Sequence, residues 1–510
     1  MKLYIPALLL LALPLNVAAQ EHAGEHPAPE RLGKVSFPTT CAPGVQAEFE
    51  RAVALLHSFA YHVADEAFEQ VAREDPKCAM AGWGEAMANF HQIWDDRISP
   101  AGMARGRAAI EWAQGVRAGS ARERGYIAAM ALMFVDAQSA PYDVRLQRYE
   151  QAMERLAANY PQDPEARIFY ALALLATAAP DDKTHRNQKK AAELLEPLYR
   201  EFPEHPGVVH YLIHACDNAE MAQRGLEAAR VYAHIAPSAP HALHMPSHIF
   251  TRLGMWKDSI QSNLAARAAA HQQGDIGEEL HAMDYLVYAY LQMGRDADAA
   301  RVLGELRGMG ALPGGFKTGY AATAMPVRYA MERGNWTQAA ASTPAAGASP
   351  WVEAVAVWAR AVGRARTGDI AGAQSEITKL MQLEKDSQSL REFYWAEQVR
   401  IQVLEADGWY AQANGESTEA ETALRRAAEL EDGIEKRPVT PGPVTPAREQ
   451  LADLLLEQGH AKAALAEYES ALDNSPGRRR ALVGAREAAR RVGNEEKVRF
   501  YTQALQPATP

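Results

Sequence analysis

The sequence predicts an all-α fold of stacked helical hairpins, and three observations support this. Alanine is abundant and β-branched residues are not, which favours helix over strand. Helical segments stop at recurring prolines, as at Pro203 and Pro237, which lie 34 residues apart. Short glycine turns then recur along the rest of the chain. With 510 residues, 48% of them hydrophobic and 23% charged, the chain is globular and long enough for a repeat array.

The first 19 residues are typical of a secretory signal peptide. Lys2 supplies a short positive start, residues 3–15 are apolar but too short to span a bilayer, and Val17-Ala18-Ala19 fits small-residue cleavage. We therefore expect a periplasmic or secreted protein without a transmembrane segment after cleavage; an uncleaved membrane anchor is the alternative. Residues 20–44 are predicted to be a flexible leader.

Export bears on the three cysteines, because an oxidising compartment permits a disulfide. Cys41 and Cys78 flank the first helix pair, so we predict that they pair with each other. Cys216 is then a free thiol. It is either a buried small hydrophobe or a metal ligand, since it follows His214 by two residues.

Residues 45–305 are predicted to form an N-terminal, histidine-rich repeat block. In the segment from Ala64 to Pro76, Ala64, Ala67, Phe68 and Val71 fall on one helix face, and the proline then ends the helix. Similar stops follow at the two prolines named above. Each such unit is a hairpin that cannot bury its own apolar face, so neighbouring units must stack to build a core.

Glycines that suit the turns between helices continue this pattern, because glycine leaves a helix easily with positive φ. Two of the intervals between them equal 34 residues, and the longer ones imply inserted loop residues. They are Gly254, Gly294, Gly334, Gly368, Gly415, Gly459 and Gly493.

These repeats resemble the tetratricopeptide repeat (TPR) family over about residues 45 to 505. The stretches "LLHSFAYHVADEAF", "APHALHMPSHIFTRLGMW" and "HAMDYLVYAYLQMG" also resemble a group of exported bacterial TPR proteins without settled activity. The resemblance implies a tetratricopeptide-type helical-hairpin solenoid, a right-handed superhelix in two repeat blocks. It also implies that a protein or peptide partner binds in the concave groove, which the first helix of each hairpin lines.

Two irregular segments are expected to subdivide the array. Residues 306–327 are rich in glycine and are predicted to form a loop, followed by a C-terminal TPR block over residues 328–505. Residues 436–448 form a proline-rich connector. This connector either lies on the surface as a semi-rigid spacer, or is laid across the groove of the superhelix or presented to a partner.

The histidines are concentrated in the N-terminal block, since only His460 of the sixteen lies beyond His281. His210 and His244 are 34 residues apart, as are His214 and His248, so each pair occupies equivalent repeat positions. Within a repeat, the two histidines are four residues apart and share a helix face.

A histidine pair with this spacing can present two ring nitrogens to one metal ion. We therefore predict a transition-metal site for zinc, copper or iron, holding one ion or two. The predicted ligands are His210, His214, His244, His248, His281 and Asp284. The alternative is that the histidines simply pack between helix layers. Pro246, between His244 and His248, is expected to weaken the helical geometry of that pair.

Other residues are predicted to line the groove near this patch or to orient the metal ligands. They are His57, His91, His241, Asp217, Arg252, Tyr211 and Tyr285. A small molecule could also bind at the patch. An open coordination position would allow hydrolytic or oxidative chemistry, whereas a closed ligand set would be structural or serve transport.

Charge and missing motifs exclude several function classes. The net charge of -11 argues against a general nucleic-acid binder. The sequence has no phosphate-binding loop, dinucleotide-binding fingerprint, serine elbow or His-Glu-x-x-His motif. The function expected is that of an exported scaffold that binds a partner and carries a histidine-rich metal site. The alternative is a metal-dependent enzyme centred on the same histidines.

Overall fold

The computed structural model describes residues 30–93, 97–116, 119–135, 137 and 140–506. The predicted signal peptide, residues 1–19, lies outside the described residues, as does most of the first half of the predicted leader. Among the described residues, no helix is both long enough and apolar enough to cross a membrane. Residues Arg31–Pro510 group into one unit by their contacts, and everything below concerns that unit.

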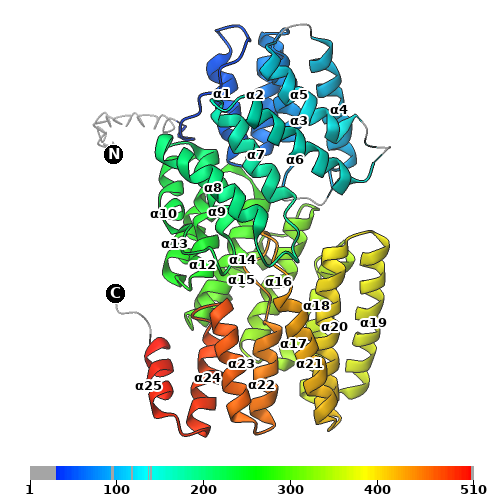
Figure 1. Cartoon of the computed structure of the whole chain (residues 1–510). Coiled ribbons are helices and arrows are strands. Elements are labelled where there is room, and N and C mark those ends of the chain that lie inside the picture. Colours follow the sequence, from blue (N-terminus) through cyan, green and yellow to red (C-terminus); the bar gives the residue numbers. More distant parts are fainter. Residues whose placement is uncertain (1–29, 94–96, 117–118, 136, 138–139, 507–510) are drawn as a thin grey trace, which may run out of the picture. The chain divides into compact units, whose positions relative to one another are not determined.

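The first helices pack as successive hairpins, each helix against the next in the chain (Figure 1). They are α1 (Gln46–His57), α2 (Tyr61–Glu74), α3 (Ala79–Ala88), α4 (Pro100–Gly115), α5 (Ala121–Phe134), α6 (Tyr142–Asn159), α7 (Pro164–Ala176), α8 (Arg186–Glu201), α9 (Pro206–Cys216) and α10 (Leu226–Ile235). The three prolines predicted to stop helices, Pro76, Pro203 and Pro237, each follow the last helical residue by two positions, which confirms their role.

The middle of the chain contains α11 (Pro240–His244), α12 (Pro246–Arg252), α13 (Trp256–Gln273), α14 (Ile276–Gln292), α15 (Asp296–Gly308), α16 (Phe316–Glu332) and α17 (Trp336–Ala339). Pro246 does interrupt the helix, because it has no N–H to donate. Met245, between α11 and α12, nevertheless keeps helical angles, with φ −52° and ψ −36°. The chain therefore continues along a helical path through the break.

The C-terminal part contains α18 (Pro350–Thr367), α19 (Ile370–Ser389), α20 (Phe393–Ala413), α21 (Ser417–Asp432), α22 (Ala447–Glu457), α23 (Ala461–Asn474), α24 (Arg479–Arg491) and α25 (Glu495–Ala504), coloured yellow-green to red in Figure 1. All seven glycines predicted at turns have positive φ, between 61° and 86°. The predicted class, a tetratricopeptide-type helical-hairpin solenoid, is therefore confirmed by the hairpins themselves.

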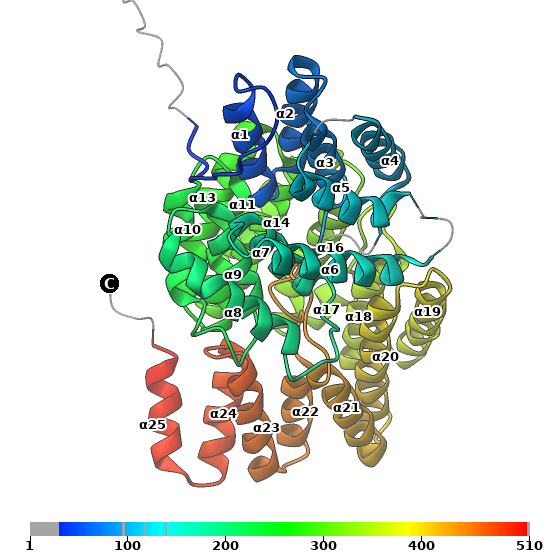
Figure 2. The ribbon, with the colours of Figure 1, turned by 45° about the horizontal axis from the view of Figure 1, so that its top comes forward.

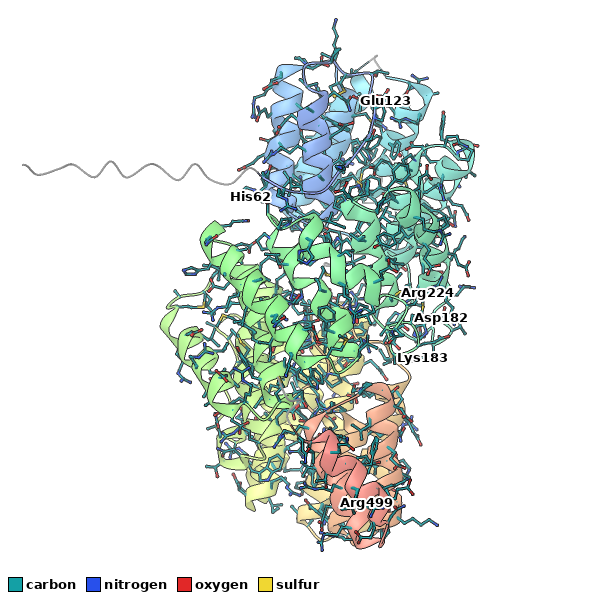
Figure 3. All side chains as sticks on the ribbon, turned by 90° about the vertical axis from the view of Figure 1, so that its left-hand side faces the viewer. His62, Glu123, Asp182, Lys183, Arg224 and Arg499 are labelled. Carbon is teal, nitrogen blue, oxygen red and sulfur yellow. A yellow bond between two sulfur atoms is a disulfide. The ribbon has the colours of Figure 1, made fainter. Side chains whose placement is uncertain are left out.

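The leader departs from the prediction of flexibility in its second half. Phe37 is fully buried and packs edge-on against Phe49 and Trp83 at centroid distances of 5.6 Å. The N–H and hydroxyl of Thr40 donate to the carboxylate of Glu123 on α5, which is labelled in Figure 3. Aromatic burial thus orders residues 31–44 against the first hairpins.

The predicted glycine-rich loop, residues 306–327, is shorter in the structure. α15 continues to Gly308 and α16 begins at Phe316, so the irregular segment is residues 309–315. Tyr320, Ala324 and Val327 recur at helical spacing and are buried, and this apolar face outweighs the glycines and Pro326 inside α16.

The proline-rich connector is not a surface spacer. Thr440, Val444 and Thr445 are buried, and the Thr440 carbonyl accepts a hydrogen bond from the hydroxyl of Tyr285 on α14 at 3.3 Å. Figure 2 shows this orange segment after α21 running up among the green helices. The connector therefore packs among the helices rather than on the surface.

Candidate metal centre

Four helices bring six histidines together in the interior. α9 carries His210 and His214, α11 carries His241 and His244, α12 carries His248, and α14 carries His281. They form two triads, named here triad A (His210, His214, His241) and triad B (His244, His248, His281). Within each triad, one nitrogen from every ring lies within 4.8 Å of the other two. His241, which was predicted only to line the groove, is therefore a full member of triad A.

The surroundings of α9 explain why these rings are buried rather than exposed in a groove. Every residue of α9 is buried, and Val208, Val209, Leu212 and Ile213 surround the histidines with apolar side chains. A helix that is apolar all round belongs in a core. The placement of the histidines on an open concave surface, which the resemblance implied, is thus wrong for α9.

Triad B has a hydrogen-bond arrangement that leaves two lone pairs facing each other. His248 Nδ1 donates to the Asp217 carboxylate at 2.8 Å, and His244 Nδ1 donates to Asn263 Oδ1 at 2.7 Å. The Asn263 amide donates to the Ser259 carbonyl, which fixes its oxygen toward His244. A neutral imidazole carries only one N–H, so Nε2 of both histidines is an acceptor.

These two Nε2 atoms nevertheless lie only 3.0 Å apart. Two acceptors at that distance repel each other unless a proton or a metal ion lies between them. A zinc ion sits about 2.0–2.1 Å from an imidazole nitrogen, so one ion fits between nitrogens at this spacing. The proline break, which we expected to weaken this pair, leaves its separation close to the 3.1 Å between the Nε2 atoms of His210 and His214.

Triad A has similar outer partners. His210 Nδ1 donates to the backbone carbonyl of His57 at 2.6 Å, and His241 Nδ1 faces a Glu278 carboxylate oxygen at 3.4 Å. Both rings therefore direct Nε2 lone pairs inward in their neutral form. Metal-bound histidines usually donate their second N–H to a carboxylate or a backbone carbonyl. His210, His241 and His248 find such an oxygen here, and His244 finds a side-chain amide oxygen instead.

The two triads are neighbours. The ring centroids of His214 and His248 lie 6.0 Å apart, and those of His241 and His244 lie 6.1 Å apart. Six imidazoles thus form a continuous cluster that can hold two ions, one for each triad.

Burial favours the neutral state, in which imidazoles bind metals, for five of these rings. Burial is the first cause, and neighbouring histidines the second, that hold the pKa of His210, His214, His244 and His281 well below the ordinary value. Burial also lowers the pKa of His248 to about 4, although the Asp217 carboxylate opposes that shift.

Asp217 joins triad B to a buried group of charges. It ion-pairs with Arg252 at 2.8 Å and with Lys436, from the connector, at 2.9 Å. Burial alone would raise the pKa of Asp217, but Lys436 and Arg252 hold it well below its usual range. Asp217 and Arg252 were predicted to orient the imidazoles. In the structure, Asp217 contacts His248, and Arg252 contacts Asp217.

The two tyrosines predicted near the patch lie on different sides of it. The Tyr285 hydroxyl is 3.5 Å from His248 Nε2 and also faces the Pro438 and Thr440 carbonyls of the connector. The Tyr211 hydroxyl lies 2.9 Å from Nδ1 of His57. Tyr285 therefore contacts triad B directly. Tyr211 instead contacts His57, whose backbone carbonyl accepts a hydrogen bond from His210 of triad A.

Two predicted residues lie outside the triads. Asp284, a predicted ligand, is buried one helical turn from His281 and pairs with Arg328 at 3.4 Å. His91, which like His57 was predicted to line the groove near the patch, follows the end of α3 and stacks on Tyr61 with ring centroids 4.4 Å apart. His57 itself is fully buried near triad A, so the two residues do not share a site.

A further group, His57, Glu165 and His205, was missed by the sequence analysis. The Glu165 carboxylate is 2.9 Å from Nε2 of His57 and 2.8 Å from Nε2 of His205. Each Nε2–H can donate to this carboxylate, so no lone pairs face each other as they do in triad B. Glu165 lies 108 residues from His57, so the sequence does not indicate that the two residues meet. The only signal in the sequence is that His205 is the N-cap residue before Pro206.

The cysteines do not contribute a ligand to either triad. The structure joins Cys41 and Cys78 by a disulfide that closes a separation of 37 residues. Cys216 is a free, buried thiol, and burial raises its pKa to about 12. Cys216 belongs to neither triad, and a buried thiol of this kind packs as a small hydrophobe.

Comparison with known proteins gives no functional assignment. No family model matches the sequence, and no curated protein matches it. Solved structures do align with it. Naa15/Naa10 bound to HypK-THB is 13% identical, with 91% of this chain and 63% of that chain covered and a TM-score of 0.26.

Two further structures contain tetratricopeptide repeats. The P58(IPK) TPR domain is 11% identical, with 89% of this chain and 99% of that chain covered and a TM-score of 0.20. A STAND protein with a tetratricopeptide repeat sensor from Pyrococcus horikoshii is 12% identical, with coverages of 83% and 55% and a TM-score of 0.36. Similarity at this level assigns no residue role and no activity.

Proposed function

We propose that this protein is an exported TPR-type scaffold whose interior binds two transition-metal ions, one in each histidine triad. The observation that carries the proposal is the pair of Nε2 lone pairs of His244 and His248, which face each other at 3.0 Å. Imidazole ligands suit zinc, copper, iron and nickel, whereas magnesium and calcium require oxygen ligands. Zinc, copper or iron is therefore the class of ion proposed.

Metal content measured on the purified mature chain tests this proposal. After reconstitution with zinc, copper(II) or iron(II) and removal of excess metal, two ions per chain are expected for one of these metals. The double substitution His244→Ala and His248→Ala should remove one of the two ions. His62→Ala is the matched control, because the side chain of His62 is 85% exposed and His62 belongs to neither triad. A wild-type chain that retains none of the three metals would exclude the proposal.

Export is the second part of the proposal. The Cys41–Cys78 disulfide supports it, because such bonds persist in oxidising compartments. Cell fractionation and N-terminal sequencing of the mature protein are the test, with a start near Gln20 expected. An intact N-terminus on a cytosolic protein would contradict it.

A further inference from the structure

A cavity of about 1050 Å³ lies beside triad A. His214 and Asp217 form part of its wall, together with Leu146, Phe393, Tyr394 and Lys436. Cavities of this size accommodate small organic molecules, and this wall combines apolar side chains with many charged ones, such as Arg97, Arg145 and Glu397.

The two triads differ in their relation to this cavity. His214 lines it and is 8% exposed, so an edge of triad A reaches the space. His244, His248 and His281 are at most 1% exposed, and none of them lines the cavity. An ion in triad A is therefore one ring away from the cavity, whereas an ion in triad B is enclosed.

Different groups cover the triads on their other sides. Phe59 stacks on His214 and His241 with centroid distances of 5.7 and 5.3 Å, which closes triad A away from the cavity. Tyr285 packs against His244 and His248 at 4.6 and 5.3 Å and closes triad B under the connector. Of the six rings, only that of His214 lines the cavity, so triad A is the triad that a molecule in the cavity approaches.

The cavity also reaches the protein surface. Phe393, at the start of α20, lines it and is 68% exposed. On another part of the wall, Glu435 pairs with Lys183, which is labelled in Figure 3 in the loop between α7 and α8. Charged side chains line the cavity both beside Phe393, as at Arg391 and Glu392, and next to His214, as at Asp217.

We propose that this cavity is a binding chamber for a small organic molecule with an apolar body and an oxygen or nitrogen donor group. The donor binds the ion held by triad A, while the ion of triad B is enclosed and structural. This inference rests on the proposed function, since it requires both ions to be present. Three imidazoles leave a fourth position open for such a donor, as in catalytic zinc sites.

Release of zinc from the two-ion protein to excess EDTA tests the difference in access. Two phases of equal amplitude are expected, with the fast phase at least ten times faster than the slow one. His214→Ala should abolish the fast phase, and His248→Ala should abolish the slow phase. Ala178→Trp, which fills the cavity from its wall without touching a ligand, should slow only the fast phase.

Cobalt(II)-loaded protein titrated with acetohydroxamate, a small organic donor, provides the second measurement. Visible absorption should change to saturation at one equivalent per chain, and Ala178→Trp should weaken that binding. Two bound ions that leave in a single phase, or acetohydroxamate binding to both or neither, would overturn this inference but not the proposed function. A chain without metal would overturn both.

Discussion

Asp217 accepts a hydrogen bond from Nδ1 of His248 at 2.8 Å while it pairs with two buried cations. The carboxylate therefore fixes the tautomer and the orientation of a ring that has its other nitrogen in triad B. Groups that hold a ligand in this way contribute to metal affinity, as the ligands themselves do.

Asp217→Asn should lower metal affinity about 10- to 100-fold, because the amide removes the negative charge that orients His248. Competition with a chromophoric chelator measures the affinity. The substitution also leaves Lys436 and Arg252 with one fewer anion, which lowers stability. The double variant Asp217→Asn with Lys436→Met restores the charge balance and should keep the loss of affinity. Equal affinity in wild type and double variant would refute the role of the carboxylate.

Gly207→Ala should destabilise the fold by about 1–3 kcal/mol. A Cβ atom at this position would lie 2.4 Å from Nδ1 of His57, whose carbonyl supports His210. Gly304→Ala on α15 is the matched control, because its Cβ would meet nothing closer than 3.9 Å. That control should be more stable than wild type by about 0.5–1 kcal/mol. Urea unfolding followed by circular dichroism compares the two, and the prediction fails if both variants shift the same way.

Removal of the disulfide by Cys41→Ala and Cys78→Ala should cost about 4 kcal/mol of unfolding free energy. The estimate follows from the closure entropy of a loop spanning 37 residues. Chemical denaturation with and without dithiothreitol measures it. The reductant should destabilise the wild type toward the level of the variant and leave the variant unchanged, whereas a variant that still responds to reductant would contradict the assignment.

Glu431 should make stability fall as pH rises. Burial raises its pKa to about 8, whereas the unfolded chain titrates near 4.5. The native state therefore binds more protons than the unfolded state between pH 4.5 and 8. The stabilisation present at low pH is lost across that window, by up to about 1.4 kcal/mol per pH unit.

Glu431→Gln keeps an oxygen for the Ala447 N–H, which donates to Glu431 at 2.8 Å, but cannot ionise. Denaturation midpoints between pH 5 and 8 should therefore fall less steeply in this variant than in wild type. Glu419→Gln, at an exposed position on the same helix, should match the wild-type slope. Identical slopes for all three proteins would show that Glu431 titrates normally.

Local signals in the sequence were enough to predict the helices and the histidine pairs. Prolines, glycines and the 34-residue register depend on neighbours within one hairpin, so residues such as Pro203 and Gly254 could be interpreted directly. The spacing of His210 and His214 fixes their shared helix face regardless of the rest of the fold.

The surroundings of those histidines depend on distant parts of the chain and could not be predicted in the same way. No feature of the sequence indicates that the Asn263 amide fixes the tautomer of His244. The same holds for the Lys436 ammonium that faces Asp217. The burial of α9 did have a signal, because Val208, Val209, Leu212 and Ile213 leave it no polar face. Asp284 was misassigned because Arg328, which binds it, follows 44 residues later.

The connector has a consequence for how the protein matures. The carbonyl of Thr440 that meets Tyr285 lies 155 positions further along the chain, so triad B stays uncovered until the connector packs against α14. Ions can enter at that stage without any opening of the finished protein. Once residues 438–445 are in place, a metal ion can exchange at triad B only if this segment moves away. We therefore expect triad B to keep the metal ion that was available when the protein folded.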